Sequence, residues 1–299
     1  MDMSPSEAGK RTAPPVFEFG RSLMGGYEVL FSDVWGVLHD GVTAYNEATD
    51  ALERFRAKGG TVILVSNAPV PSMRVAEMLA DKKVSRGAWD AIVSSGDIAL
   101  SHIDACGFER LHWIGPVDRD KALFDKMHWP SEPLETADAI LCSGLDDDIN
   151  ETAESYRARL EIALGRNLPF VCANPDLVVD VGGRHYPCAG AIADLYEEMG
   201  GPVFWAGKPH AIAYRAAHET AERIRGKHVD TREILVIGDA VRTDLEGAKN
   251  FGVDALFIAS GIHAPDIMNG NAIDETSLAK LFAGCDPENP VGAMSHLRW

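Results

Sequence analysis

The amino-acid sequence predicts an α/β fold: a parallel sheet covered by helices, with a second α/β domain inserted in the middle of the chain. Two observations lead to this prediction. Short apolar runs alternate with helix-like segments from one end of the chain to the other. These runs are also too numerous for one compact sheet of ordinary size. A chain of 299 residues with 46% hydrophobic content is long enough to bury the cores of two such units.

The first elements follow from apolar spacing and from residues that stop helices. The run YEVLFSDV, residues 27–34, predicts a strand. Apolar residues at positions 48, 51, 52 and 55 predict a helix, with Asn46 as its N-cap and Gly59 and Gly60 as its stop. The run TVILVSN, residues 61–67, has no polar alternation, which is typical of a strand buried on both faces.

The same alternation continues to residue 259. Further strands are expected at residues 91–95, 110–115, 137–144, 169–174, 202–207, 233–239 and 253–259. Helices are expected around residues 75–79, 96–106, 151–164, 189–199 and 244–252. Neither an internal repeat nor a low-complexity tract interrupts this order.

Composition and charge narrow the class of protein. A net charge of −17 argues against nucleic acid or an anionic membrane as the main partner. The five cysteines are scattered without CxxC spacing, which favours reduced thiols. The first residues lack the apolar core of a signal peptide, and no run is long enough to span a membrane, so a cytoplasmic protein is expected. Residues 1–19 are expected to form a flexible tail, and residues 286–299 a loosely held end.

Polar residues stand at the ends of four predicted strands. Asp33 ends the first, Ser66 and Asn67 end the second, Lys208 follows the run VFWAG, and Asp239 ends EILVIGD with Asp244 just beyond it. Each one alone is explained by a helix cap, a turn or a solvated side chain. Parallel sheets, however, place ligand sites at the carboxyl ends of their strands. Together these residues supply a carboxylate nucleophile, acids for Mg²⁺ and donors for phosphoryl oxygens, which is the set that phosphoryl transfer needs.

In this order, Asp33, Ser66, Lys208 and the segment GDAVRTD resemble the four motifs of the haloacid dehalogenase-like superfamily. The segments GVLHDG, SNAP, CANPD, YPCAGAIADLYEEMG and WAGKPH resemble its class IIA branch, which contains NagD-like proteins and p-nitrophenylphosphatases. The likeness extends from about residue 27 to about residue 261. It implies a Rossmann-like core formed by residues 20–105 and 205–299, with a cap domain at residues 106–204.

The resemblance also assigns roles. Asp33 would attack phosphorus and become an aspartyl phosphate, and Lys208 would neutralise the charge that develops there. Mg²⁺ would be held by Asp33, the backbone carbonyl of Trp35 and Asp239, with Asp244 ligating or supporting. Ser66 and the backbone amide of Asn67 would bind a phosphoryl oxygen. In the cap, the polar residues expected to read the leaving group are Asn174, Asp176 and Tyr186, although a role in shaping loops explains them equally well.

The sequence departs from the family pattern at Trp35. Phosphatases of this superfamily normally carry a second Asp here, which protonates the leaving oxygen and then activates water. An indole only donates a hydrogen bond and does not titrate usefully. General acid–base catalysis contributes roughly 10²–10⁴-fold, so its loss is a substantial part of the rate.

Several interpretations of Trp35 remain open at this point. The protein could be a slow phosphatase or one whose substrate has a good leaving group. His39, Asp40 or a cap residue could replace the missing acid. The protein could also bind a phosphorylated ligand without turning it over. Metal-free dehalogenases of the superfamily carry an aromatic residue here, but the acidic GDAVRTD segment favours Mg²⁺. The sequence thus predicts a Mg²⁺-dependent phosphatase for a small phosphorylated metabolite (a sugar phosphate, nucleotide or aryl phosphate), and the branch allows a homodimer.

Overall fold

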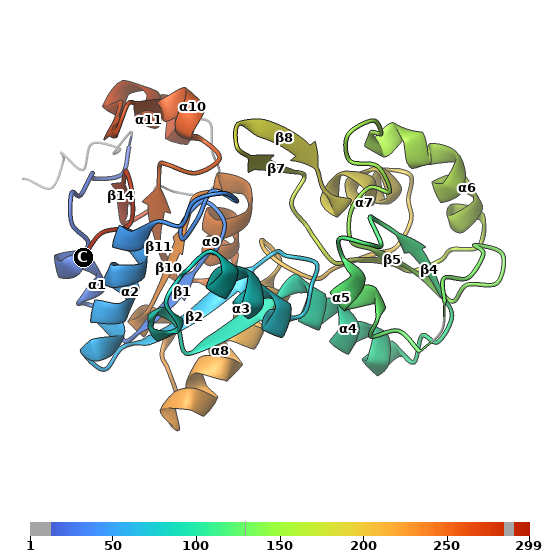
Figure 1. Cartoon of the computed structure of the whole chain (residues 1–299), viewed down its shortest axis with the longest axis horizontal. Coiled ribbons are helices and arrows are strands. Elements are labelled where there is room, and N and C mark those ends of the chain that lie inside the picture. Colours follow the sequence, from blue (N-terminus) through green and yellow to red (C-terminus); the bar gives the residue numbers. More distant parts are fainter. Residues whose placement is uncertain (1–12, 129, 284–289) are drawn as a thin grey trace, which may run out of the picture.

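The computed structural model describes residues 13–128, 130–283 and 290–299. The chain forms two lobes, each with its own parallel sheet (Figure 1). The larger sheet has six strands in the order β14-β11-β10-β1-β2-β3, and all of its pairings are parallel. Its strands are β1 (Val29–Ser32), β2 (Thr61–Ser66), β3 (Ala91–Ser94), β10 (Ile234–Gly238), β11 (Asp254–Ile258) and β14 (Gly292–Met294). The predicted α/β class with a parallel core is confirmed.

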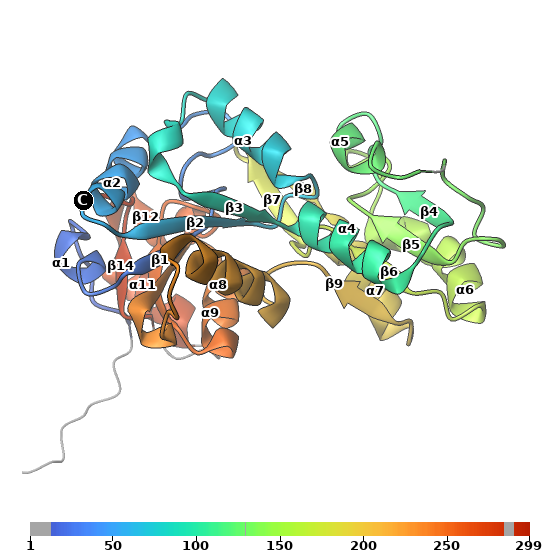
Figure 2. The ribbon, with the colours of Figure 1, turned by 90° about the horizontal axis from the view of Figure 1, so that it is seen from below.

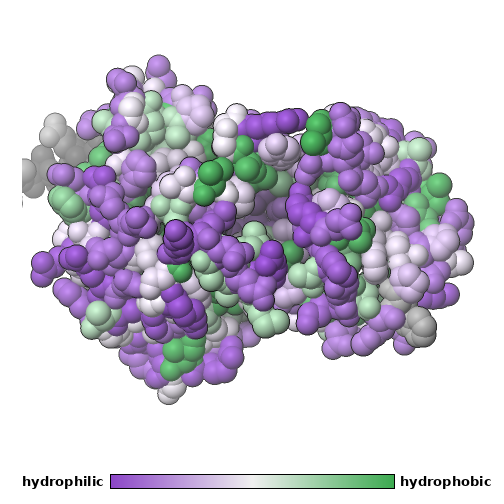
Figure 3. All heavy atoms as spheres, in the orientation of Figure 1, coloured by the Kyte–Doolittle hydropathy of each residue, from purple (hydrophilic) through white to green (hydrophobic). Residues whose placement is uncertain are grey.

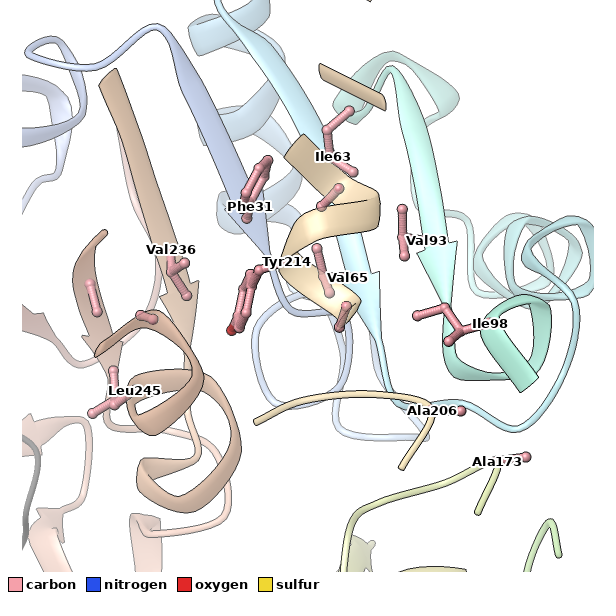
Figure 4. Close-up of a cluster of buried hydrophobic side chains, with 14 of the residues drawn as sticks. Phe31, Ile63, Val65, Val93, Ile98, Ala173, Ala206, Tyr214, Val236 and Leu245 are labelled. Atoms are coloured by element: carbon pink, nitrogen blue, oxygen red, sulfur yellow. The ribbon is translucent and has the colours of Figure 1, made fainter. Parts of the chain in front are cut away.

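Helices cover both faces of the six-stranded sheet (Figure 2). On one face, alternate residues of β1 and β2 pack against α2 and α3; on the other, the intervening residues pack against α8 and α9. Figure 4 shows the second cluster, in which Phe31 of β1 stacks on Tyr214 of α8 with ring centroids 6.1 Å apart. The helices of this lobe are α1 (Arg21–Met24), α2 (Asn46–Ala57), α3 (Ser72–Asp81), α4 (Ser95–Cys106), α8 (Ala211–Arg225), α9 (Glu246–Phe251), α10 (Ala264–Ile267) and α11 (Glu275–Ala283).

The smaller lobe contains a four-stranded parallel sheet in the order β4-β5-β6-β9. A separate antiparallel hairpin, β7-β8, projects from this lobe toward the larger one (Figure 1). The elements of this lobe are β4 (Leu111–Ile114), β5 (Ala139–Cys142), β6 (Phe170–Cys172), β7 (Val178–Val181), β8 (Arg184–Pro187), β9 (Val203–Trp205), α5 (Lys121–Phe124), α6 (Arg157–Gly165) and α7 (Ala189–Glu198). The strands of this sheet lie between Leu111 and Trp205.

Short elements complete the chain. Three are 3₁₀ turns, at Arg86–Ala88, Ala153–Tyr156 and Thr231–Glu233, and one is a π-helical turn at Val241–Leu245. The strands β12 (Met268–Asn269) and β13 (Ala272–Ile273) form a small antiparallel pair. Within the described residues, no helix combines the length and the apolar character needed to cross a bilayer.

Two local predictions were wrong. Asn46 is the first residue of α2, and Tyr45 occupies the N-cap position without a side-chain hydrogen bond. The prediction of a loosely held carboxyl end is wrong for residues 290–299, because β14 pairs with β11 and Met294 is fully buried. Residues 286–289 lie outside the described residues. The three-residue strand is too short to show a periodicity in the sequence.

The predicted amino-terminal tail of residues 1–19 lies partly outside the described residues. Its last part runs beside β14, where the Ala293 amide donates to the Pro15 carbonyl and the Phe17 amide donates to the Ala293 carbonyl, at 2.9 and 2.8 Å. Residues 15–17 are therefore attached to the edge of the larger sheet. The physical reason is that β14 offers a free edge, which this extended segment pairs with.

Candidate active site

The carboxyl ends of β1, β2 and β10 bring the predicted residues to one edge of the sheet. Ser32 pairs in register with Leu64 on one side and with Ile237 on the other. Asp33, Ser66 and Asp239 therefore leave three adjacent strands close to the same level. The chain continues from β2 to β3 on one side of β1 and from β10 to β11 on the other. The crevice at β1 and β10 is thus the switch point at which α/β sheets bind ligands.

Three carboxylates meet at this edge. One oxygen from each of Asp33, Asp239 and Asp244 lies within 4.8 Å of the others, and Asp239 and Asp244 are buried. The Lys208 ammonium reaches this group, with Nζ 2.8 Å from Asp33 Oδ1 and 2.7 Å from Asp244 Oδ1. Three negative charges against one positive charge leave an excess of negative charge in a buried site. Such an excess fits a bound divalent cation, and a set of hard oxygen donors is what Mg²⁺ prefers.

The titration of these groups reflects the same crowding. Burial and the neighbouring Asp244 carboxylate raise the pKa of Asp33 well above its usual range, and Lys208 offsets only part of this rise. Burial and Asp244 raise the pKa of Asp239 to about 7, although the Ile262 amide donates to its Oδ2 at 2.7 Å. Burial alone would lower the pKa of Lys208, but Asp244 and Asp33 raise it well above its usual range. The lysine is therefore a permanent cation.

Close backbone approach shapes the site around Asp239. A Cβ atom on Gly36 would lie 2.2 Å from Asp239 Oδ2, and one on Gly261 would lie 1.8 Å from the same oxygen. Only glycine fits at these two positions. Because the carbonyl of Trp35 belongs to the peptide that joins it to Gly36, this peptide passes beside the Asp239 carboxylate.

Lys208 reaches the site by a route that the sequence did not predict. The run VFWAG was expected to be a strand, and as β9 it belongs to the four-stranded sheet of the smaller lobe. Lys208 lies on the segment between β9 and α8, where its amide donates to Asn67 Oδ1 at 2.9 Å. Periodicity identifies a strand but does not say which sheet it joins, so the sequence did not specify this placement.

Asn67 connects the two lobes. Its Nδ2 donates to Asp176 Oδ1 at 2.9 Å and to the Lys208 carbonyl at 3.1 Å, while its Oδ1 accepts from Ser95 Oγ at 3.3 Å.

Ser66 is 8% exposed, and its Oγ accepts from the Ala68 amide at 3.2 Å. A hydroxyl that accepts one hydrogen bond still has its own hydrogen to donate.

A cavity of about 100 Å³ opens beside these groups, between the two lobes. Figure 3 shows that this face of the molecule is hollowed between the lobes. Of the predicted residues, Asp33, Trp35, Asp239 and Asp176 line the cavity. Its other walls are Gly36, Asp40, Tyr45, Val178, Val179, Asp180, Ala240, Thr243, Ser260, Gly261 and Ile262.

The three predicted cap residues differ in their positions. Asp176 lines the cavity and is half-buried, and desolvation raises its pKa. Asn174 and Tyr186 do not line it: Asn174 Oδ1 accepts from the Asp176 amide at 3.2 Å, and the Tyr186 ring lies under the guanidinium of Arg184 at 5.1 Å. Asn174 thus shapes the loop that presents Asp176.

Sequence reasoning missed the hairpin β7-β8, whose residues Val178, Val179 and Asp180 line the cavity. Its turn is formed by Gly182 and Gly183, with φ angles of 62° and 81°. A Gly-Gly pair between runs of β-favouring residues is a recognised signal of a two-residue hairpin turn. The sequence was instead interpreted as a loop there.

Neither His39 nor Asp40 is suited to act as the general acid. His39 is 2% exposed and its Nδ1 accepts from the Gly41 amide at 2.9 Å, while burial lowers its pKa to about 4. It does not line the cavity. Asp40 does, and although burial alone would raise its pKa, the amides of Thr43 and Val42 lower it. At neutral pH the imidazole is neutral and the Asp40 carboxyl is ionised, so neither carries a proton to donate.

Comparisons with family descriptions and with solved structures point to the same family. Residues 30–127 match the family described as haloacid dehalogenase-like hydrolase, and residues 205–283 match the one described as HAD-hydrolase-like. The crystal structure of a hydrolase of the haloacid dehalogenase-like family from Brucella suis 1330 is 40% identical, with a TM-score of 0.81, and covers 94% of this chain and 100% of that one.

Two curated proteins are more distant relatives. The 5′-nucleotidase YutF of Bacillus subtilis (strain 168) is 25% identical over 246 residues, which are 79% of this chain and 88% of that protein. The ribonucleotide monophosphatase NagD of Escherichia coli (strain K12) is 29% identical over 98 residues, which are 32% of this chain and 36% of that protein.

Proposed function

Because the chain belongs to the haloacid dehalogenase-like hydrolase family, in its class IIA, NagD-like branch, we propose that it hydrolyses phosphate monoesters through Asp33. The observation that carries the proposal is the grouping of three carboxylates and a buried lysine at the carboxyl edge of a parallel sheet. Residues 20–105 and 205–299 are proposed as the catalytic core, and residues 106–204 as the cap.

The metal proposed for this site is Mg²⁺. Asp33, Asp239, Asp244 and the backbone carbonyl of Trp35 would hold it, since the three carboxylates already converge and the Trp35–Gly36 peptide passes beside Asp239. When bound, the ion supplies positive charge that stabilises the phosphoryl oxygens and the crowded carboxylates.

Asp33 is proposed as the nucleophile. Its Oδ1 accepts from the Val34 amide at 2.7 Å and from Lys208 Nζ at 2.8 Å, so Oδ2 is the oxygen proposed to attack phosphorus. The new Asp33–phosphorus bond forms as the bond to the leaving oxygen breaks. Ser66 and the amide of Asn67 are proposed to donate to the phosphoryl oxygens, and Lys208 to balance the charge on the acyl phosphate.

Trp35 cannot transfer the protons, and we assign that role to Asp176. Asp176 lines the cavity together with Asp33, and the side-chain Nδ2 of Asn67 donates a hydrogen bond to Asp176 Oδ1. Burial raises the pKa of Asp176, which favours the protonated form that a general acid needs. In the first step its proton goes to the leaving oxygen. In the second step the carboxylate takes a proton from the water that attacks phosphorus, and the Asp33–phosphate bond breaks to release inorganic phosphate.

The substrate is proposed to be a small phosphorylated metabolite, such as a sugar phosphate, a nucleotide or an aryl phosphate. The two curated relatives are named for nucleotide substrates, which supports this class without choosing within it. We also propose that the protein is a cytoplasmic homodimer that pairs through the cap. Light scattering on the purified protein tests whether it is a dimer.

The decisive experiment measures phosphate release from a panel of monoesters with Mg²⁺ and with EDTA. We expect Mg²⁺-dependent release that Asp33→Asn abolishes. The control is Asp50→Asn, which removes an exposed carboxylate that pairs with Arg54 on the same helix. If wild type releases no phosphate across the panel and beryllium fluoride with Mg²⁺ does not occupy Asp33, the phosphatase proposal is wrong.

A further inference from the structure

The indole of Trp35 makes a hydrogen bond to the smaller lobe. Its Nε1 donates a hydrogen bond to the backbone carbonyl of Asp180 at 2.9 Å. Asp180 lies 145 residues further along the chain, in strand β7 of the hairpin. The bond therefore joins the loop that follows the proposed nucleophile to the hairpin of the smaller lobe.

The ring is held in place by its neighbours. It meets His39 edge to face, with centroids 4.9 Å apart and an interplanar angle of 73°. A Cβ atom on Gly41 would lie 2.5 Å from Trp35 Cζ2 and 3.4 Å from Val181 Cγ1. Gly41 has a φ of 90°, so this position requires glycine on both conformational and steric grounds. The ring and the hairpin thus pack against the same point of the loop.

The hairpin itself has little to hold it. All four residues of β7 are half-buried, and β8 begins with two exposed residues. A two-stranded hairpin is marginally stable by itself in water, so its position depends on the surfaces that it touches. Figure 1 shows that it reaches from the smaller lobe toward the larger one. The hydrogen bond from Trp35 joins its β7 strand to the larger lobe.

The same segment of the hairpin encloses the cavity. Val178, Val179 and Asp180 form one wall, Trp35 contributes another, and Asp33 lies among the lining residues. The cavity is small, with a volume of about 100 Å³, and it is partly open to solvent. With the hairpin in this position we expect the site to favour a compact leaving group over a bulky one.

We propose that Trp35 is a positioning residue that fastens the hairpin β7-β8 over the cavity and thereby restricts the leaving group to compact ones. The residue that replaces the usual acid acts as a clasp between the lobes. The part that concerns leaving groups rests on the proposed phosphatase function, whereas the clasp itself does not.

The first test measures hydrogen exchange of the backbone amides of residues 178–187 without substrate. Trp35→Phe keeps an aromatic ring and removes the N–H donor. We expect exchange in the hairpin to accelerate about 2- to 12-fold, the factor that corresponds to the net worth of one hydrogen bond. The matched control is Trp205→Phe, which removes an indole N–H that donates to Glu197 within the smaller lobe at 3.3 Å. It should leave exchange in the hairpin unchanged.

A hairpin that exchanges at the wild-type rate in Trp35→Phe would overturn the proposal. Val181→Ala provides a second route, since it removes packing between the hairpin and the Gly41 loop while the indole stays intact. Accelerated exchange in this variant as well supports the clasp.

The second test compares kcat/KM for alkyl phosphates of increasing leaving-group size. In Trp35→Phe we expect the ratio of large to small substrates to rise several-fold, mainly through a lower KM for the large ones. Phenylalanine provides no proton donor, so such a change does not come from a new acid. An unchanged ratio refutes the role in selectivity. If wild type has no activity but the exchange result holds, the phosphatase proposal fails and the clasp stands.

Discussion

Replacing Lys208 with methionine should destabilise the metal-free protein strongly. The side chain is 3% exposed, and its ammonium contacts Asp33 at 2.8 Å and Asp244 at 2.7 Å. Methionine is similar in length but carries no charge. The variant would therefore leave the three carboxylates of the site without their cation.

The magnitude follows from the burial of the pair. Removing one partner of a buried ion pair costs about 3–5 kcal/mol because the remaining charge stays buried and unpaired. With a urea m-value of about 3 kcal/mol/M, this cost lowers the unfolding midpoint by about 1–1.7 M. The loss should be smaller at pH 5 than at pH 8, because burial and Asp244 raise the pKa of Asp33 and its protonation removes part of the repulsion.

The assay is urea unfolding in EDTA, followed by circular dichroism at both pH values. Lys227→Met is the matched control: its ammonium pairs with Glu28 at 2.6 Å, but the side chain is 49% exposed. An exposed pair is worth about 0–1 kcal/mol, so this midpoint should move by about 0.3 M or less. Equal shifts for the two variants, or a larger loss for Lys208→Met at pH 5, would refute the charge argument.

Four further outcomes are expected. Burial and Asp244 raise the pKa of Asp239 to about 7, so the metal-free protein loses stability as the pH rises from about 4 to 7. In EDTA, the free energy of unfolding of Asp239→Asn should therefore rise relative to that of wild type between pH 5 and pH 8. A difference between the two that does not change with pH contradicts this. In steady-state assays, Asp176→Asn should slow the hydrolysis of alkyl phosphates by about 10²-fold or more and the hydrolysis of aryl phosphates far less. Equal losses of rate for the two substrate classes would show that Asp176 is not the general acid. Gly261→Ala should abolish the stabilisation by Mg²⁺ seen in thermal unfolding, since its Cβ would meet Asp239, whereas Gly165→Ala, which meets nothing within 4 Å, should retain it. His39→Gln should leave the pH–rate profile between pH 5 and 8 unchanged, because the buried imidazole is already neutral there; a lost titration step would restore it as a proton carrier.

Local chemistry explains what could be predicted from the sequence. The parallel sheet follows from apolar runs such as residues 61–67, and the grouping of Asp33 with Asp239 follows from the rule that parallel strands present their carboxyl ends together. Both depend only on short segments and on their order.

Tertiary pairing explains what could not. The strand before Lys208 joins the other sheet, and nothing in three residues of β9 specifies that partner. The bond from Trp35 to Asp180 links positions 145 residues apart, so the sequence shows that an acid is missing but not what the indole does instead. The hairpin could have been predicted from the sequence, because Gly182 and Gly183 mark its turn.

The pairing of β14 at the sheet edge bears on how the protein folds as it is synthesised. All strands of the smaller sheet lie between Leu111 and Trp205, so this lobe is complete once that stretch has left the ribosome. The larger sheet begins at Val29 and ends at Met294, and residues 15–17 bond to Ala293. Since chains emerge from the amino terminus at about 5–20 residues per second, the inserted lobe can fold before the lobe that surrounds it. The catalytic edge would then be among the last parts of the molecule to form.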